Sequence, residues 1–197
     1  MKQGVVIKNM NGYFYVQTPS GDVHECKVRG RLKKERYSLL VGDTVSITDD
    51  GWINTIEGRR NSLRRPAIAN IDQVIVVVAA REPDIHPLLL DRLLVMIHHS
   101  NIPPVLVINK YDLHTEDTVK LKSIYENIGY TVLCSSTYTG EGIDELRHVL
   151  HGKISAFAGP SGVGKSSLLN AVDPNFAFQT GAVSDKIKRG RHTTRHA

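Results

Sequence analysis

The segment with the clearest chemical potential is a glycine-rich run over residues 159–167. It matches the pattern GxxxxGK[ST], and it lies between a predicted strand at 154–158 and a predicted helix that begins near Gly164. Glycines let consecutive backbone N–H groups converge on phosphate oxygens, and the helix N-terminus adds its positive dipole end. A nucleoside triphosphate is expected at these residues: Gly159, Pro160, Ser161, Gly162, Val163, Gly164, Lys165, Ser166 and Ser167.

Two side chains of this loop have specific expected roles. Lys165 can reach the β- and γ-phosphates, while the Ser166 hydroxyl can ligate Mg²⁺. The alternative is an ordinary glycine-rich turn, but the strand before the loop and the helix after it favour phosphate binding.

A second motif follows the apolar stretch at residues 105–108. Asn109, Lys110, Tyr111 and Asp112 match NKxD, the pattern with which GTPases recognise their base. The aspartate can accept from guanine N1–H and the exocyclic amine, whereas adenine would leave it unpaired. Helix capping is the alternative for an isolated Asn and Asp. Next to a phosphate loop, the motif predicts guanine binding by these four residues.

Two further segments gain their meaning from position. Ser135 and Ser136 end the next predicted strand, at 131–135, and resemble the small-residue loop whose backbone N–H groups contact guanine O6. The alternative is an ordinary serine-rich loop. About twenty residues after the helix of the phosphate loop come Thr193 and Thr194, which are expected to join Ser166 at Mg²⁺ and to sense the γ-phosphate. The alternative is a basic, polar and disordered tail.

The elements that must position these groups alternate between strand and helix. Apolar strand patterns at 71–80, 105–109, 131–135 and 154–158 are separated by helical patterns at 87–99, 115–128 and 143–150, with another at 164–172. This alternation predicts a parallel α/β sheet. Since ordinary GTPases have the phosphate loop first and NKxD late, the order of motifs here is circularly permuted.

Residues 1–66 have a different pattern and are expected to form a separate domain, followed by a second domain over 67–197. Five short β-type segments are separated by turn signals, and they predict a closed five-stranded barrel of the OB type. The segments are 4–8, 13–18, 25–28, 43–48 and 52–56. The arginine-rich stretch 59–66 is expected to be a linker.

The positive charge is concentrated in this first domain. Residues 1–66 hold 12 Lys and Arg against 7 Asp and Glu, whereas the remaining residues hold 13 of each class. An excess confined to one domain favours a polyanionic partner such as RNA, although a solvated basic loop is the alternative. The candidate RNA contacts are Lys27, Arg29, Arg31, Lys33, Lys34 and Arg36.

Composition excludes several classes of protein. With 41% hydrophobic and 23% charged residues, the chain can bury a core, and its apolar runs are shorter than the ~20 residues of a membrane-spanning helix. No signal peptide is indicated. Cys26 and Cys134 lack the spacing of a disulfide framework or a zinc cluster. We expect a cytoplasmic protein without membrane association.

Over its whole length the chain resembles the circularly permuted GTPases of small ribosomal subunit biogenesis, the RsgA/YjeQ family. The resemblance is carried by the segments 68–73, 109–112, 159–167 and 189–194. It implies a monomeric, Mg²⁺-dependent GTPase that assists late maturation of the 30S subunit. Its OB domain would contact 16S rRNA, and ribosome-stimulated hydrolysis of GTP to GDP would be coupled to release. His192 resembles the family histidine proposed to orient the attacking water, with an exposed loop histidine as the alternative.

The sequence departs from the family pattern after His192-Thr193-Thr194. Family members continue into a DxPG motif and a C-terminal zinc domain with Cys and His ligands, and neither is present in these 197 residues. The chain therefore resembles a truncated protein, and slow GTP hydrolysis is expected from it alone. The alternative function is a nucleotide-regulated rRNA-binding module with incidental hydrolysis. The two differ in whether 30S subunits raise kcat.

Overall fold

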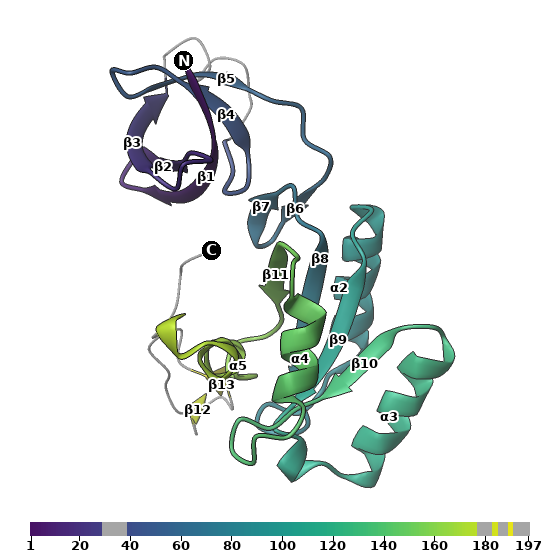
Figure 1. Cartoon of the computed structure of the whole chain (residues 1–197). Helices are drawn as coiled ribbons and strands as arrows, with labels where there is room; N and C mark the ends of the chain where they lie inside the picture. Colours follow the sequence, from purple (N-terminus) through teal and green to yellow (C-terminus); the bar gives the residue numbers. More distant parts are fainter. Residues whose placement is uncertain (29–38, 177–182, 185–188, 191–197) are drawn as a thin grey trace. The chain divides into compact units, whose positions relative to one another are not determined.

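The computed structural model describes residues 1–28, 39–176, 183–184 and 189–190. These form two compact units, one ending at Ile71 and the other starting at Asp72 (Figure 1). The domain boundary expected between residues 66 and 67 stays a prediction.

The first unit is a closed barrel of five strands, as the sequence predicted. The strands are β1 (Lys2–Met10), β2 (Tyr13–Gln17), β3 (Val23–Val28), β4 (Thr44–Ile47) and β5 (Trp52–Ile56). They pair in the order β1-β2-β3-β5-β4, in which β3 and β5 run parallel and the other printed pairs are antiparallel. Alternate residues face inward. The buried core consists of Val6, Val16, Cys26, Leu39, Val45, Ile47 and Ile53.

A buried ion pair links the residue before β4 to the segment that follows β5. The Asp43 side chain is fully buried, and Arg59 binds it with two nitrogens: Nε lies 2.6 Å from Oδ1 and Nη2 lies 2.8 Å from Oδ2. The backbone N–H of Leu40 also donates to Oδ2 at 2.7 Å. The ion pair and the hydrogen bond offset the free-energy cost of removing this carboxylate from water.

The stretch expected to be a linker contains a strand. β6 (Ser62–Arg64) pairs antiparallel with β7 (Ala67–Ala69), and the Ala69 N–H donates to the Val41 carbonyl oxygen at 2.8 Å. The Leu63 side chain between the arginines is only 1% exposed. Leu63 in β6 and Ala69 in β7, which is 0% exposed, anchor this short hairpin, and the arginines around Leu63 hid it in the sequence pattern.

The second unit is an α/β fold whose strands and helices alternate as predicted. Its strands are β8 (Gln73–Ala79), β9 (Pro104–Asn109), β10 (Thr131–Cys134) and β11 (Ser155–Ala158). Its helices are α2 (Pro87–His99), α3 (Glu116–Asn127), α4 (Ile143–Leu150) and α5 (Lys165–Val172), with the short 3₁₀ turns η1 (Tyr111–Leu113) and η2 (Pro174–Phe176). Two-residue strands β12 (Val183–Ser184) and β13 (Arg189–Gly190) pair with each other.

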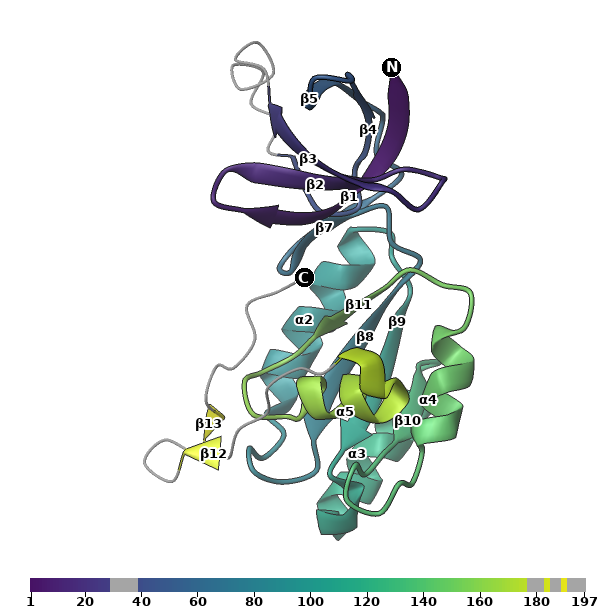
Figure 2. The same cartoon turned by 60° about the vertical axis from the view of Figure 1, so that its left-hand side comes forward.

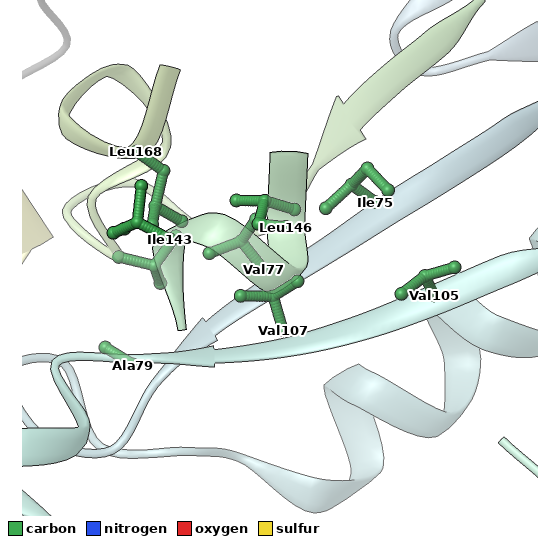
Figure 3. Close-up of a cluster of buried hydrophobic side chains, with 9 residues drawn as sticks. Ile75, Val77, Ala79, Val105, Val107, Ile143, Leu146 and Leu168 are labelled. Carbon is green, nitrogen blue, oxygen red and sulfur yellow. The ribbon is translucent and has the colours of Figure 1, made fainter. Parts of the chain in front are cut away.

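The sheet is parallel with strand order β10-β9-β8-β11, so the carboxyl ends of all four strands lie at one edge. α4 and α5 cover one face, where Ile143, Leu146 and Leu168 pack against strand residues such as Val77 and Val107 (Figures 2 and 3). α2 packs against β8 and β9. Among the described residues, no helix has the length and apolar character needed to cross a membrane.

Candidate nucleotide-binding site

The loop from Gly159 to Gly164 joins β11 to α5 and passes over the ends of neighbouring strands. A Cβ on Gly159 would lie 2.1 Å from the Val77 carbonyl oxygen, and a Cβ on Gly164 would lie 2.3 Å from Asn109 Nδ2. Both glycines also have positive φ, 144° and 94°. Only glycine permits this close approach in this backbone conformation. The role that the sequence pattern indicated, convergence of backbone N–H groups on phosphate, stays a prediction.

The N-terminus of α5 has an electrostatic character that suits an anion. Its N-cap is Gly164, which has no side chain, and its first turn contains no acidic residue. In contrast, α3 begins with a capping box at Thr115 and carries Glu116 and Asp117 in its first turn. The positive end of α5 is therefore not compensated by acids in its own first turn, and backbone N–H groups at such an end bind phosphate.

Lys165 lies over the loop and is partly buried. Its Nζ donates to the carbonyl oxygens of Gly159 at 3.0 Å and Pro160 at 2.7 Å. Burial lowers the pKa of this ammonium from its ordinary value. A bound phosphate would offset the desolvation of the charged form, so the lysine is placed for an anionic ligand.

Asn109 connects the NKxD motif to the phosphate loop. The residue ends β9 and is 1% exposed. Its Nδ2 donates to the Val163 carbonyl oxygen at 2.8 Å, and its Oδ1 accepts from the Ser135 hydroxyl at 3.3 Å. β8 separates the strands that carry the two motifs, so this side chain joins them across the sheet edge.

Asp112 is held by the second serine. Ser136 Oγ donates to Asp112 Oδ1 at 2.5 Å and accepts from the backbone N–H groups of Tyr138 and Thr139, both at 3.2 Å. Ser136 is fully buried, whereas Asp112 is exposed at the surface. The carboxylate is thus fixed at one oxygen while it remains accessible to a ligand.

The serines act in this structure mainly through their hydroxyls. The Ser135 N–H donates to the Ile108 carbonyl oxygen and the Ser136 N–H donates to the Glu141 carbonyl oxygen, both at 2.9 Å. These N–H groups, which the sequence led us to expect at guanine O6, are therefore engaged within the protein. The side chains instead orient Asn109 and Asp112.

Lys110 and Tyr111 complete the NKxD motif. Lys110 has φ 55° and donates to the Glu82 carbonyl oxygen. Burial lowers its pKa, against the opposing effects of Glu82 and Asp112. The Tyr111 ring stacks on His114 with centroids 4.5 Å apart and 10° between the planes. Sequence reasoning missed Glu82, although its loop follows β8 at the same sheet edge as the motifs.

Of the candidate metal, catalytic and RNA-binding residues, the structure describes only two, Ser166 and Lys27. Ser166 is the second residue of α5 and is half-buried, next to Lys165. Lys27 lies exposed on β3, in the other compact unit. The other predicted metal, catalytic and RNA-binding residues fall outside the described residues: Arg29, Arg31, Lys33, Lys34, Arg36, His192, Thr193 and Thr194.

Comparisons with known proteins agree with this architecture. The family model of the RsgA N-terminal domain matches residues 3–53 of this chain, and the family model of the RsgA GTPase matches residues 56–197. A protein of Alkaliphilus metalliredigens, "Small ribosomal subunit biogenesis GTPase RsgA", is 46% identical over 203 residues, covering 100% of this chain and 69% of its own length. A protein of the same name from Agathobacter rectalis is 44% identical, covering 98% and 70%.

Solved structures give the same result. The crystal structure of YjeQ from Thermotoga maritima matches with a TM-score of 0.79 and 38% identity, covering 90% of this chain and 67% of that one. YloQ, described as a circularly permuted GTPase, matches with a TM-score of 0.70 and 37% identity, covering 91% and 67%. With both family domains matched in order along almost the whole sequence, the chain belongs to the RsgA GTPase family.

Proposed function

We propose that this chain is a GTPase that assists late maturation of the small ribosomal subunit. The observation that carries the proposal is the 2.8 Å hydrogen bond from Asn109 Nδ2 to the Val163 carbonyl oxygen, because it brings a base-recognition motif and a phosphate loop to one site. The names of the relatives support the ribosomal role.

In this proposal the base is read by Asp112. Ser136 occupies one lone pair of Oδ1, so the carboxylate retains acceptor capacity for guanine N1–H and the exocyclic amine. Asn109, Lys110 and Tyr111 form the surrounding pocket, and Ser135 positions Asn109. Adenine would leave Asp112 without donors, which accounts for selection against ATP.

In this proposal residues 159–167 bind the phosphates of the nucleotide, and Lys165 contacts the β- and γ-phosphates. Gly159, Gly162 and Gly164 have positive φ, which lets the loop curl so that its backbone N–H groups can converge on phosphate. The Ser166 hydroxyl is a hard oxygen donor of the kind Mg²⁺ prefers. Mg²⁺ would be held by Ser166 together with Thr193 and Thr194, and it would supply positive charge next to the phosphate oxygens. His192 orients the attacking water.

The partner in this proposal is the 30S subunit, contacted through 16S rRNA. The electrostatic attraction comes from the six candidate RNA contacts, of which Lys27 is the one that the structure describes: Lys27, Arg29, Arg31, Lys33, Lys34 and Arg36. GTP hydrolysis to GDP drives release from the rRNA, and the protein acts as a cytoplasmic monomer.

The test is steady-state GTP hydrolysis by the full chain with increasing concentrations of purified 30S subunits. A rise in kcat by orders of magnitude supports the proposal. A flat kcat with retained, salt-sensitive 30S binding would instead favour an rRNA-binding module whose hydrolysis is incidental. Purified 50S subunits provide the matched control.

A further inference from the structure

The outer face of the barrel carries two tyrosines in a row. In β2, Phe14 and Val16 pack toward the barrel core, while Tyr13 and Tyr15 point to the other side of the strand and are half-buried. Two residues along a strand span about 7 Å, and this sets the distance between the two rings along β2.

A lysine from each neighbouring strand lies over one of these rings. Lys8 of β1 pairs with Tyr15 in the strand register, and its Nζ is 5.4 Å from the ring centroid. Lys27 of β3 places its Nζ 4.9 Å from the Tyr13 centroid. Both lysines are exposed. Each ring is therefore in contact with a flexible side chain that bears a positive charge.

A third contact fixes one ring. The Tyr15 hydroxyl donates to Glu25 Oε2 at 2.9 Å across the β2–β3 pair, and this bond raises the pKa of the phenol. The Tyr15 hydroxyl therefore stays protonated and donates to Glu25. This bond fixes the position of the ring but does not cover its flat face. An anchored ring loses little entropy when a flat ligand stacks on it.

We propose that this tyrosine–lysine face, made of Lys8, Tyr13, Tyr15 and Lys27, binds a single-stranded RNA segment by stacking one unpaired base on each tyrosine. The spacing of about 7 Å is roughly twice the ~3.4 Å rise between stacked bases, so neighbouring bases must separate to occupy both rings. The lysines move from the rings to the flanking phosphates. The inference rests on the proposed function for its choice of RNA.

The positive charge of the first domain and its barrel fold favour single-stranded RNA over an apolar peptide as the ligand of this face. The face lies within the 66 residues that carry the whole positive surplus of the chain, and Lys27 opens the basic run that ends at Arg36. Aromatic rings beside cations are the usual way in which barrels of this kind hold single strands. Double-stranded RNA does not offer free base faces, so the proposal predicts discrimination against it.

The test measures fluorescence anisotropy of the full chain with a labelled eight-nucleotide oligouridylate and with a 16-base-pair RNA duplex. Replacing both rings, Tyr13→Leu with Tyr15→Leu, should weaken binding of the single strand at least fivefold, because stacking contributes substantially for each base. The matched variant Tyr13→Phe with Tyr15→Phe keeps both rings and should bind within about twofold of the native chain. Trp52 fluorescence in β5 checks that each barrel is folded.

Salt dependence separates stacking from charge. The leucine variant should keep the slope of log affinity against log salt, whereas Lys8→Gln and Lys27→Gln should each reduce it by about 0.7. Lys2→Gln, on the same strand as Lys8 but away from the tyrosines in sequence, is the charge control and should leave the slope unchanged.

Wild-type affinity in the folded leucine variant, or equal affinity for duplex and single strand, would overturn the stacking proposal. These outcomes are distinct from failure of the proposed function, which would appear as absence of 30S-stimulated hydrolysis in the unaltered chain. A leucine variant that binds RNA normally while 30S subunits still raise kcat would reject the stacking face alone.

Discussion

Asn109 Nδ2 donates to the carbonyl oxygen of Val163 at 2.8 Å, and this bond spans 54 residues of sequence. It ties the end of β9 to the loop before α5, across the end of β8. The order of the two motifs along the chain is inverted relative to ordinary GTPases, yet one buried amide connects them. The site therefore depends on contacts at the sheet edge rather than on chain order.

Removal of this amide should weaken nucleotide binding as a whole. Asn109→Ala leaves the Val163 carbonyl without its buried donor, which costs about 1–3 kcal/mol of folding stability, and GDP affinity should fall because the phosphate loop is no longer held to β9. Ser135→Ala removes only the bond to Asn109 Oδ1 and should have a smaller effect. Titration with a fluorescent GDP analogue measures both. An Asn109→Ala chain with native affinity would contradict the proposed coupling.

The Gly164 position should not tolerate a side chain. In Gly164→Ala the new Cβ would lie 2.3 Å from Asn109 Nδ2 at a φ of 94°, so the loop must shift and GDP binding should be lost. Gly152→Ala is the control, since Gly152 also has positive φ but nothing lies within 4 Å of its Cβ position. Calorimetric titration with GDP distinguishes the two. Equal affinities would show that the close approach at Gly164 is unimportant.

Lys165 should give nucleotide binding a pH dependence. Burial lowers the pKa of its ammonium, and a bound phosphate should raise it again, so binding takes up a proton at pH values between the free and bound pKa. Affinity should therefore fall as pH rises through that window. Calorimetry of GDP binding in buffers of different ionisation enthalpy measures the proton directly. Lys165→Met should bind weakly and take up no proton from this group.

The same shift has a consequence for stability. Because the folded pKa of Lys165 lies below the unfolded value, the unfolded state binds more protons in the interval between them. Stability of the nucleotide-free chain should therefore rise with pH across that interval as far as this group is concerned. The stability difference between Lys165→Met and the native chain, measured by urea unfolding, should shrink over the same interval. A pH-independent difference would argue against the lowered pKa.

The barrel should depend on the pair formed by Asp43 and Arg59. Arg59→Met leaves a fully buried carboxylate without its cation and should cost about 3–5 kcal/mol. Lys122→Met breaks the exposed pair with Glu126 and should cost less than about 1 kcal/mol. The single tryptophan, Trp52, lies in β5 and reports on barrel unfolding in urea. Equal midpoints for the two variants would contradict a stabilising role for the buried pair.

Most helices and strands could be predicted from the sequence because the spacing of apolar residues along the chain follows which side chains are buried. The strand Gln73–Ala79 is buried along its whole length and reads as a continuous apolar run, and the Pro87–His99 helix was bounded correctly from its spacing. The hairpin of β6 and β7 was missed because Leu63, the one buried residue of β6, stands among arginines, and the buried residue of β7 is a small alanine, Ala69. The arginine-rich composition therefore predicted a linker where two short strands pair.

The candidate site was predictable in its motifs but not in its internal bonds. Motif spacing indicates which residues meet at the sheet edge, whereas it cannot show that the Ser135 and Ser136 N–H groups bond within the protein. The bond from Lys110 to the Glu82 carbonyl oxygen could not be predicted from the sequence either. Every residue has a carbonyl oxygen, and only the path of the backbone brings this one to Lys110.

The most direct test of the account is the base preference of Asp112→Asn. Replacing the carboxylate by an amide exchanges an acceptor for a donor, so the variant should lose guanine nucleotides and gain xanthine nucleotides, with a change in preference of at least about a hundredfold. Competition of GDP, XDP and ADP against a fluorescent nucleotide measures this on the native and variant chains. Native preference for GDP that inverts to XDP is the predicted result. An Asp112→Asn chain that still prefers GDP, or a native chain that binds ADP as well as GDP, would contradict it.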